Sequence, residues 1–170
     1  MNKVLGIVVA VVIAVCGYGV WRWSQSRTLY LSDLRPGREF VVASSEWTEP
    51  KIDQSIGGNP LRIASHIYAR GIGFHASTTI EVVVPHGYDR FVADVGVDAE
   101  VSPEGPSSVK FLVYGDGVVL YEGPVMRAMD PPRRVDVRVD EIRELRLVCT
   151  DAGDGNNSDH ACWADAKFVR

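Results

Sequence analysis

The stretch RVDVRVD, residues 134–140, alternates apolar and charged side chains at every position. In an extended chain Val135, Val137 and Val139 would share one face, and the charged residues between them would share the other. This period of two predicts a strand with one buried face and one face in water. Three further segments show a similar alternation: residues 78–84, 109–113 and 145–149.

Turn signals divide the rest of the chain into short segments. YGDGV, residues 114–118, places an Asp-Gly pair between apolar runs, which is typical of a tight hairpin turn. Further strands are expected at residues 38–43, 90–97, 118–122 and 166–169. Beyond residue 27 no segment has a convincing helical period. Many short strands with regular turns predict an all-β fold, an antiparallel sandwich or barrel, and roughly 140 residues suffice to bury two packed sheets.

The N-terminus has a different character, because residues 4–21 are uncharged and mostly apolar. As a helix rising about 1.5 Å per residue, this run would extend roughly 27 Å, close to the thickness of a bilayer core. We expect residues 1–27 to form a signal-anchor, a hydrophobic transmembrane helix that holds residues 28–170 outside the cytoplasm at the membrane. A cleaved signal peptide, which would leave a secreted domain, and a lipoprotein signal at Cys16 are the alternatives.

A polar loop, TDAGDGNNSDHACWAD at residues 150–165, carries the densest set of hydrogen-bonding side chains. The carboxylates of Asp151, Asp154 and Asp159 are hard oxygen ligands that suit calcium, although their spacing does not match an EF-hand. The amides of Asn156 and Asn157 could bind sugar hydroxyls directly. The alternative is a loop whose Asx side chains satisfy their own backbone.

Two cysteines flank this loop. Cys149 and Cys162 would close a disulfide of moderate loop length if the domain lies in an oxidising compartment. Such a bridge would stabilise the fold by about 3 kcal/mol in the chain-entropy model. Alternatively, Cys149 is a small buried hydrophobe in phase with Leu145 and Leu147.

Several motifs along the chain match one family in order and spacing: YLSDL at residues 30–34, PLRI at 60–63, YARGIGFHA at 68–76, FVADVGVDAE at 91–100, LRLV at 145–148 and the loop at 150–165. Together they resemble the NPCBM domain, carbohydrate-binding module family 51, from about residue 28 to residue 170. The resemblance implies a jelly-roll β-sandwich that recognises galactose-containing glycans, is usually an appendage of secreted glycoside hydrolases and often holds a structural calcium ion.

The chain departs from the family pattern at two places. Residues 46–48 read Glu-Trp-Thr where the family often has Gly-Trp-Gly, so only Trp47 carries over. Cys162 replaces the aspartate that usually precedes the tryptophan of the final motif, which removes one carboxylate beside Trp163. No catalytic domain accompanies the module in this sequence.

The aromatic candidates for sugar binding are Trp47 and Trp163, since an indole can stack on the apolar face of a pyranose. Core packing is the favoured alternative for Trp163. His75 can donate to one hydroxyl and accept from another. Asp98, together with Glu100, forms a second acidic loop, either another face of the site or a solvated turn.

We therefore predict a non-catalytic, lectin-like module that binds a galactose-type glycan outside the membrane. The net charge of −4 argues against a nucleic-acid partner. One alternative is a sandwich that has lost sugar binding and serves protein interaction or scaffolding. A small glycosidase is another, but no recognisable acid and base are paired along the chain.

Overall fold

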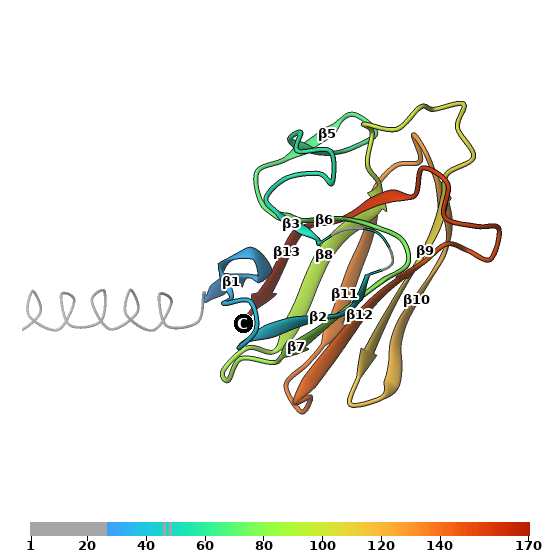
Figure 1. Ribbon diagram of the computed structural model, residues 1–170. Coiled ribbons are helices and arrows are strands. Elements are labelled where there is room, and N and C mark those ends of the chain that lie inside the picture. The colour runs from blue at the N-terminus through green and yellow to red at the C-terminus, as the bar shows by residue number, and fades with distance from the viewer. Residues whose placement is uncertain (1–26, 46, 48) are drawn as a thin grey trace, which may run out of the picture.

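The computed structural model describes residues 27–45, 47 and 49–170, and in it two β-sheets pack face to face (Figure 1). The strands are β1 (Thr28–Tyr30), β2 (Phe40–Ser45), β3 (Lys51–Ile52), β4 (Leu61–Ile63), β5 (His66–Tyr68), β6 (Gly71–His75), β7 (Thr78–Val83), β8 (Arg90–Val97), β9 (Ser108–Gly115), β10 (Val118–Arg127), β11 (Arg133–Arg138), β12 (Glu144–Thr150) and β13 (His160–Val169). A short 3-10 helix, η1 (Leu31–Asp33), follows β1.

The first sheet has the order β11-β8-β13-β6-β3, with β1 also paired to β13, and the second has the order β10-β9-β12-β7-β2. Every pairing between these strands is antiparallel. The hairpin of β4 and β5 forms a separate two-stranded sheet toward one end of the sandwich (Figure 1). The all-β antiparallel sandwich predicted from the strand pattern is confirmed.

The main core lies between the two sheets. The alternating valines that predict a strand at residues 134–140 are buried in it, while the charged residues between them are exposed. Trp163 of the first sheet meets Phe111 of the second edge to face, with ring centroids 5.1 Å apart. Contacts of this kind join the two sheets and exclude water from between them.

A second, smaller core lies on the outer face of the first sheet, beneath the β4–β5 hairpin. It contains Leu61 and Ile63 from the hairpin and Cys162 and Ala164 from β13. Side chains alternate along a strand, so β13 sends Trp163 into the main core and its neighbours into the outer one. The hairpin therefore covers a strand that is apolar on both faces.

The two cysteines face these two different cores, which corrects the expected disulfide. Cys149 packs in the main core, whereas Cys162 packs in the outer one, and both are free thiols. Burial raises the pKa of each thiol well above its ordinary value. For Cys149, the alternative of a small buried hydrophobe in phase with Leu145 and Leu147 describes the structure.

The hydrophobic helix expected within residues 1–27 lies outside the described residues, apart from Arg27. Within residues 27–45, 47 and 49–170, no helix is long and apolar enough to cross a membrane.

Candidate functional site

Two histidines meet at one end of the sandwich because neighbouring strands place them there. His75 ends β6, His160 begins β13, and the two residues are directly opposite each other in the antiparallel register. Their rings lie 5.3 Å apart in an edge-to-face arrangement. The Trp47 ring, in the segment after β2, lies 5.3 Å from the His75 ring on a tilt of 36°. Trp47 is 65% exposed, so one face of its indole is open to a ligand.

Glu100, in the turn after β8, completes the row. Its carboxylate Oε1 lies 2.7 Å from His160 Nδ1. Trp47, His75, His160 and Glu100 thus form a continuous line of an open aromatic face, two imidazoles and a carboxylate, which we call the histidine site. These four groups come from four separate segments of the chain.

The Glu100 carboxylate is fixed by hydrogen bonds from the loop between β3 and β4. Ser55 Oγ donates to Oε2 at 2.5 Å, Asn59 Nδ2 donates to Oε2 at 2.8 Å, and the backbone N–H of Gly57 donates to Oε1 at 3.0 Å. Burial raises the pKa of Glu100, but the hydrogen bonds from Ser55, Asn59 and His160 outweigh it and hold the pKa below its usual value. The group is therefore a carboxylate and an acceptor at neutral pH.

Any side chain at position 57 would displace the Glu100 carboxylate from its present place. A Cβ placed there would lie 2.4 Å from Glu100 Oε2. The absence of a side chain lets the loop backbone reach the carboxylate, so the acid is held from both main chain and side chains.

The hydrogen bonds of the two histidines determine which nitrogen is left for a ligand. His75 Nδ1 lies 2.6 Å from the carbonyl oxygen of Ala76, which can only accept, so Nδ1 carries the proton and donates. His160 Nδ1 faces a carboxylate and must likewise donate. In the neutral rings each Nε2 is then an acceptor, and neither has a partner among the described residues. The site therefore offers two acceptors beside an apolar surface.

Three residues predicted to contact a ligand are buried: Trp163, Asp98 and His75. His75 keeps 8% of its surface exposed, at the histidine site, whereas the other two are almost fully covered. Trp163 is 1% exposed within the main core, so it packs rather than binds. Asp98 is also 1% exposed, and its oxygens accept the backbone N–H groups of Arg62 at 3.1 Å and of Glu100 at 3.0 Å. Burial raises the pKa of Asp98, while these two N–H groups lower it. Its role is to hold the turn that carries Glu100.

The loop between β12 and β13 lies at the same end of the sandwich, since it joins Thr150 to His160. Asn156 is half-buried and Asn157 is exposed in this loop, and their predicted contact with a glycan stays a prediction.

Each of the three carboxylates predicted to hold calcium accepts a hydrogen bond from another group of the protein. Asp151 Oδ1 accepts the N–H of Gly153 at 3.0 Å, and Asp154 Oδ1 accepts the Ser108 hydroxyl at 2.6 Å. Asp159 Oδ1 accepts the N–H of Ser108 at 2.8 Å, whereas its Oδ2 is buried without a partner in the part of the chain that the structure describes. Across the described residues, no three acidic, histidine or cysteine side chains gather where they could hold a metal ion. The side chains therefore do not fit a three-carboxylate calcium site.

The unpartnered oxygen of Asp159 gives a prediction about pH. Burial raises the pKa of Asp159 from 3.8 to about 6. Because the folded state holds this proton more tightly than the unfolded state, stability falls as pH rises from about 4 to about 6, by up to about 3 kcal/mol for a shift of this size. Asparagine cannot ionise, so the Asp159→Asn variant should not show this fall in stability between pH 4 and pH 6. Urea denaturation at pH 4, 5, 6 and 7 would show the difference, and parallel curves for the two proteins would contradict it.

Two members of the histidine site are not selected as ligand-binding residues from the sequence. For His160 the sequence favours a structural role beside Asp159 and Asp165 over sugar binding, and for Glu100 it leaves open another face of the site or a solvated turn. The structure pairs His160 with Glu100, 60 residues away in the chain. Only the register of β6 against β13, which no local pattern contains, brings the two histidines together.

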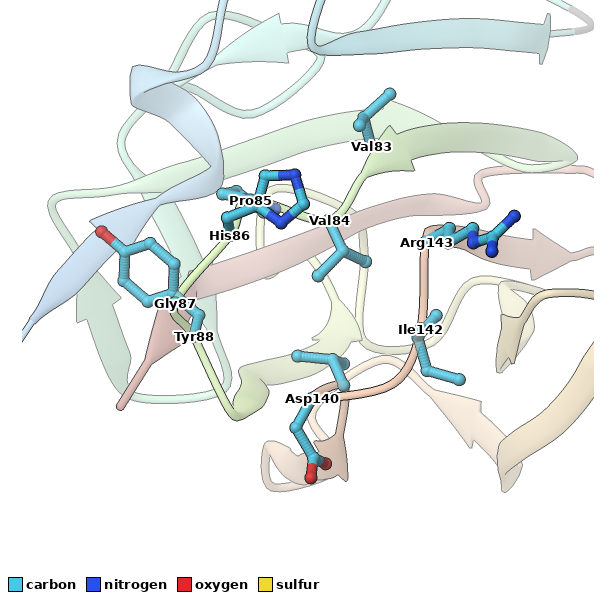
Figure 2. A pocket seen from close by; sticks show the side chains of 10 residues that line it. Val83, Val84, Pro85, His86, Gly87, Tyr88, Asp140, Ile142 and Arg143 are labelled. Carbon is cyan, nitrogen blue, oxygen red and sulfur yellow. The ribbon is translucent and has the colours of Figure 1, made fainter.

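A different cavity lies at the opposite end of the sandwich, because it is lined by residues that follow β7 whereas His75 precedes that strand. Figure 2 shows this cavity from close by. Its volume is about 320 Å³, and it is formed where the chain leaves β7 and where it enters β12. His86 and Arg143 lie at its rim, and Val84 and Ile142 supply apolar surface (Figure 2). No residue predicted to bind a ligand lies there.

Comparison with known proteins identifies the family. The model of the NPCBM/NEW2 domain matches residues 27–169. This chain belongs to the NPCBM/NEW2 family. The resemblance seen in the sequence motifs is thereby confirmed. Within the family, Alpha-1,3-galactosidase B of Akkermansia muciniphila is 31% identical over 135 residues, which is 78% of this chain but only 17% of that protein. Another curated relative, from Renibacterium salmoninarum, is matched over 10% of its length.

Solved NPCBM relatives share the fold. The CBM51 module of Clostridium perfringens GH95, in complex with methyl-galactose, is 31% identical with a TM-score of 0.75, and the match covers 84% of this chain and 99% of that one. The CBM51-2 and INT domains of Clostridium perfringens ZmpB, with CBM51-2 in complex with GlcNAc, are 38% identical with a TM-score of 0.76, over 85% of this chain and 32% of that one. The NPCBM chain described here therefore has the fold of a carbohydrate-binding module.

Proposed function

We propose that this chain is a non-catalytic carbohydrate-binding module that recognises galactose-containing glycans outside the cytoplasmic membrane. The observation that carries the proposal is the exposed Trp47 ring lying beside His75, His160 and an internally fixed Glu100. An apolar ring face next to convergent acceptors is the arrangement that sugars require, because a pyranose has both C–H faces and hydroxyl groups. The galactose complex of the GH95 module supports the choice of sugar.

Each group in the histidine site has a distinct part in the proposed binding. Trp47 stacks on the apolar face of the sugar ring. The Nε2 atoms of His75 and His160 accept hydrogen bonds from hydroxyl groups. Glu100 keeps the His160 ring in one tautomer and one orientation, because its carboxylate accepts from Nδ1. Since hydrogen bonds hold His75, His160 and Glu100 before the ligand arrives, these three side chains lose little freedom on binding.

Hydrolysis is not part of the proposal, because Glu100 and Asp98 are both engaged by the protein, and Asp159, beside His160, is 0% exposed. A glycosidase needs one protonated acid and a second carboxylate facing the bond that breaks. Glu100 is held as an anion by four donors. Asp98 is buried with both oxygens bonded to backbone N–H groups. Binding without turnover fits these environments.

Single-site affinity is expected to be weak, since an open site buries little area and sugar hydroxyls must lose water. Display of several copies at a membrane through residues 1–27, as the sequence predicts, would raise the apparent affinity through multivalency. The display at a membrane is an expectation from the apolar sequence of residues 4–21.

A glycan array probed with the full-length chain and with Trp47→Ala tests the proposal. Wild type should bind galactose-terminated glycans, and the variant should lose that binding while keeping its melting temperature, because Trp47 is 65% exposed. Val83→Ala, an exposed change at the other end of the sandwich, is the matched control. Running the array with calcium and with a chelator shows whether calcium contributes. A blank array from folded wild type would point instead to scaffolding or protein interaction.

A further inference from the structure

A cavity of about 450 Å³ lies directly beside the histidine site. Asn59 and Glu100 form part of its wall, and they are joined by the hydrogen bond from Asn59 Nδ2 to Glu100 Oε2. The carboxylate that contacts His160 on one side therefore borders this cavity on the other. A ligand seated on the two histidines would meet the cavity as soon as it extends past Glu100.

Arg62 supplies free hydrogen-bond donors in this cavity. Its Nη2 donates to the carbonyl oxygen of Ala99 at 2.9 Å, which fixes the guanidinium against the turn after β8. Its Nη1 and Nε have no partner among the described residues. In the described part of the chain, the neighbouring carboxylate of Asp98 accepts from two backbone N–H groups, one of them that of Arg62 itself. The remaining guanidinium donors are therefore available to an acceptor on a ligand.

Apolar surface lies in the same cavity. Ile67, on β5, is 73% exposed, although its neighbour Tyr68 packs against the outer core. Pro60, which precedes β4, is exposed as well and lines the cavity with it. An exposed isoleucine beside a fixed arginine offers both kinds of contact that a sugar ring uses, one for its C–H face and one for its hydroxyls.

The charges around the cavity favour a neutral ligand. Two acidic residues, Asp98 and Glu100, line the cavity together with one basic residue, Arg62. A carboxylate on the ligand would be repelled by this surplus, whereas a hydroxyl would meet the Arg62 donors without that penalty.

We infer that the cavity beside Arg62 and Ile67 is a second sugar subsite, so that the ligand of this protein is a neutral oligosaccharide of at least two sugars. The inference rests on the proposed function of the histidine site. The first sugar lies on Trp47 and the two histidines, and the second lies on Ile67 and Pro60 with its hydroxyls on Arg62 and Asn59.

Isothermal titration of the full-length chain tests this with methyl galactoside and with galactose-terminated disaccharides of several linkages. Wild type should bind at least one disaccharide about tenfold more tightly than methyl galactoside, which is about 1.4 kcal/mol. Arg62→Ala and Ile67→Ser should remove that gain and leave the affinity for methyl galactoside unchanged. Arg143→Ala, at the opposite end of the sandwich, is the control and should keep the gain.

The outcomes separate the two proposals. If methyl galactoside binds but no disaccharide binds more tightly, the second subsite is wrong and the histidine site stands. The same conclusion follows if Arg62→Ala and Ile67→Ser weaken both ligands equally. If a sialylated disaccharide binds more tightly than its neutral counterpart, the assignment of a neutral ligand is overturned. If the folded protein binds no sugar at all, the proposed function fails and the inference fails with it.

Discussion

Glu100→Gln is expected to lower galactoside affinity by tenfold or more and to destabilise the fold by about 1.5–3 kcal/mol, the range for hydrogen bonds to a charged group. All four groups that contact this carboxylate donate to it: Ser55, Gly57, Asn59 and His160. A glutamine carries an NH₂ group in place of one oxygen. In either orientation of the amide, its NH₂ group would face two groups that donate to the carboxylate in the wild-type protein. Donors would then face donors.

The loss should reach the ligand through His160. Without the full carboxylate, the ring loses the partner that fixes its proton on Nδ1. Titration of methyl galactoside and urea denaturation of the same samples would measure both effects. Glu122→Gln is the matched control, because Glu122 forms an exposed pair with Lys110 at 2.5 Å, and such pairs contribute about 0–1 kcal/mol. If Glu100→Gln behaves like the control in both assays, Glu100 has no part in the site.

The fold could be predicted from the sequence because its signals are local. The hairpin at residues 114–118 and the alternation at residues 134–140 each predict strands from neighbouring residues alone. The strand β8 (Arg90–Val97) was predicted at these same residues, but its burial was not. It lies between β11 and β13 in the first sheet and is largely buried, so polar and apolar residues do not alternate along it. Asp98, just after this strand, could be taken for a surface acid although it is buried.

The site was only half predictable, because its residues meet through strand pairing. Trp47 and His75 could be selected by residue type, since an isolated tryptophan in an irregular segment and a histidine after a glycine-rich strand both suit sugar binding. His160 directly follows Asp159, which is a nearer partner in the sequence than Glu100 is. Glu100 lies two residues after Asp98, so the two acids together look like a polar turn. The contact between Glu100 and His160 depends on the β6–β13 register and on the turn after β8, neither of which has a signature in the sequence.

The disulfide prediction failed for a related reason. Sequence separation between Cys149 and Cys162 is suitable for a bridge, but the face that each cysteine occupies depends on which sheet its strand joins. β12 lies in one sheet and β13 in the other, and Cys162 points away from the space between them. Sequence separation alone cannot distinguish two cysteines facing one core from two facing different cores.

Trp163→Ala is expected to destabilise the domain by about 3–5 kcal/mol, the usual cost of truncating a fully buried tryptophan. The centroid of the indole lies 5.1 Å from that of the Phe111 ring in the opposite sheet and 6.4 Å from that of the Phe91 ring in its own sheet. Removal of the indole therefore opens a cavity where the two sheets meet. Total stabilities of small domains are about 5–15 kcal/mol, so the variant should remain folded in the cold and melt at a much lower temperature.

The comparison with Trp47→Ala makes this prediction specific. Trp163 is 1% exposed and Trp47 is 65% exposed, so the same substitution should separate stability from binding. Trp163→Ala should lower the melting temperature sharply and, at a temperature where the variant is still folded, bind galactoside with nearly wild-type affinity. Trp47→Ala should do the reverse. Calorimetric melting with titration at 10 °C would measure both, and a Trp163→Ala protein that melts normally but does not bind would mean that this tryptophan faces the ligand after all.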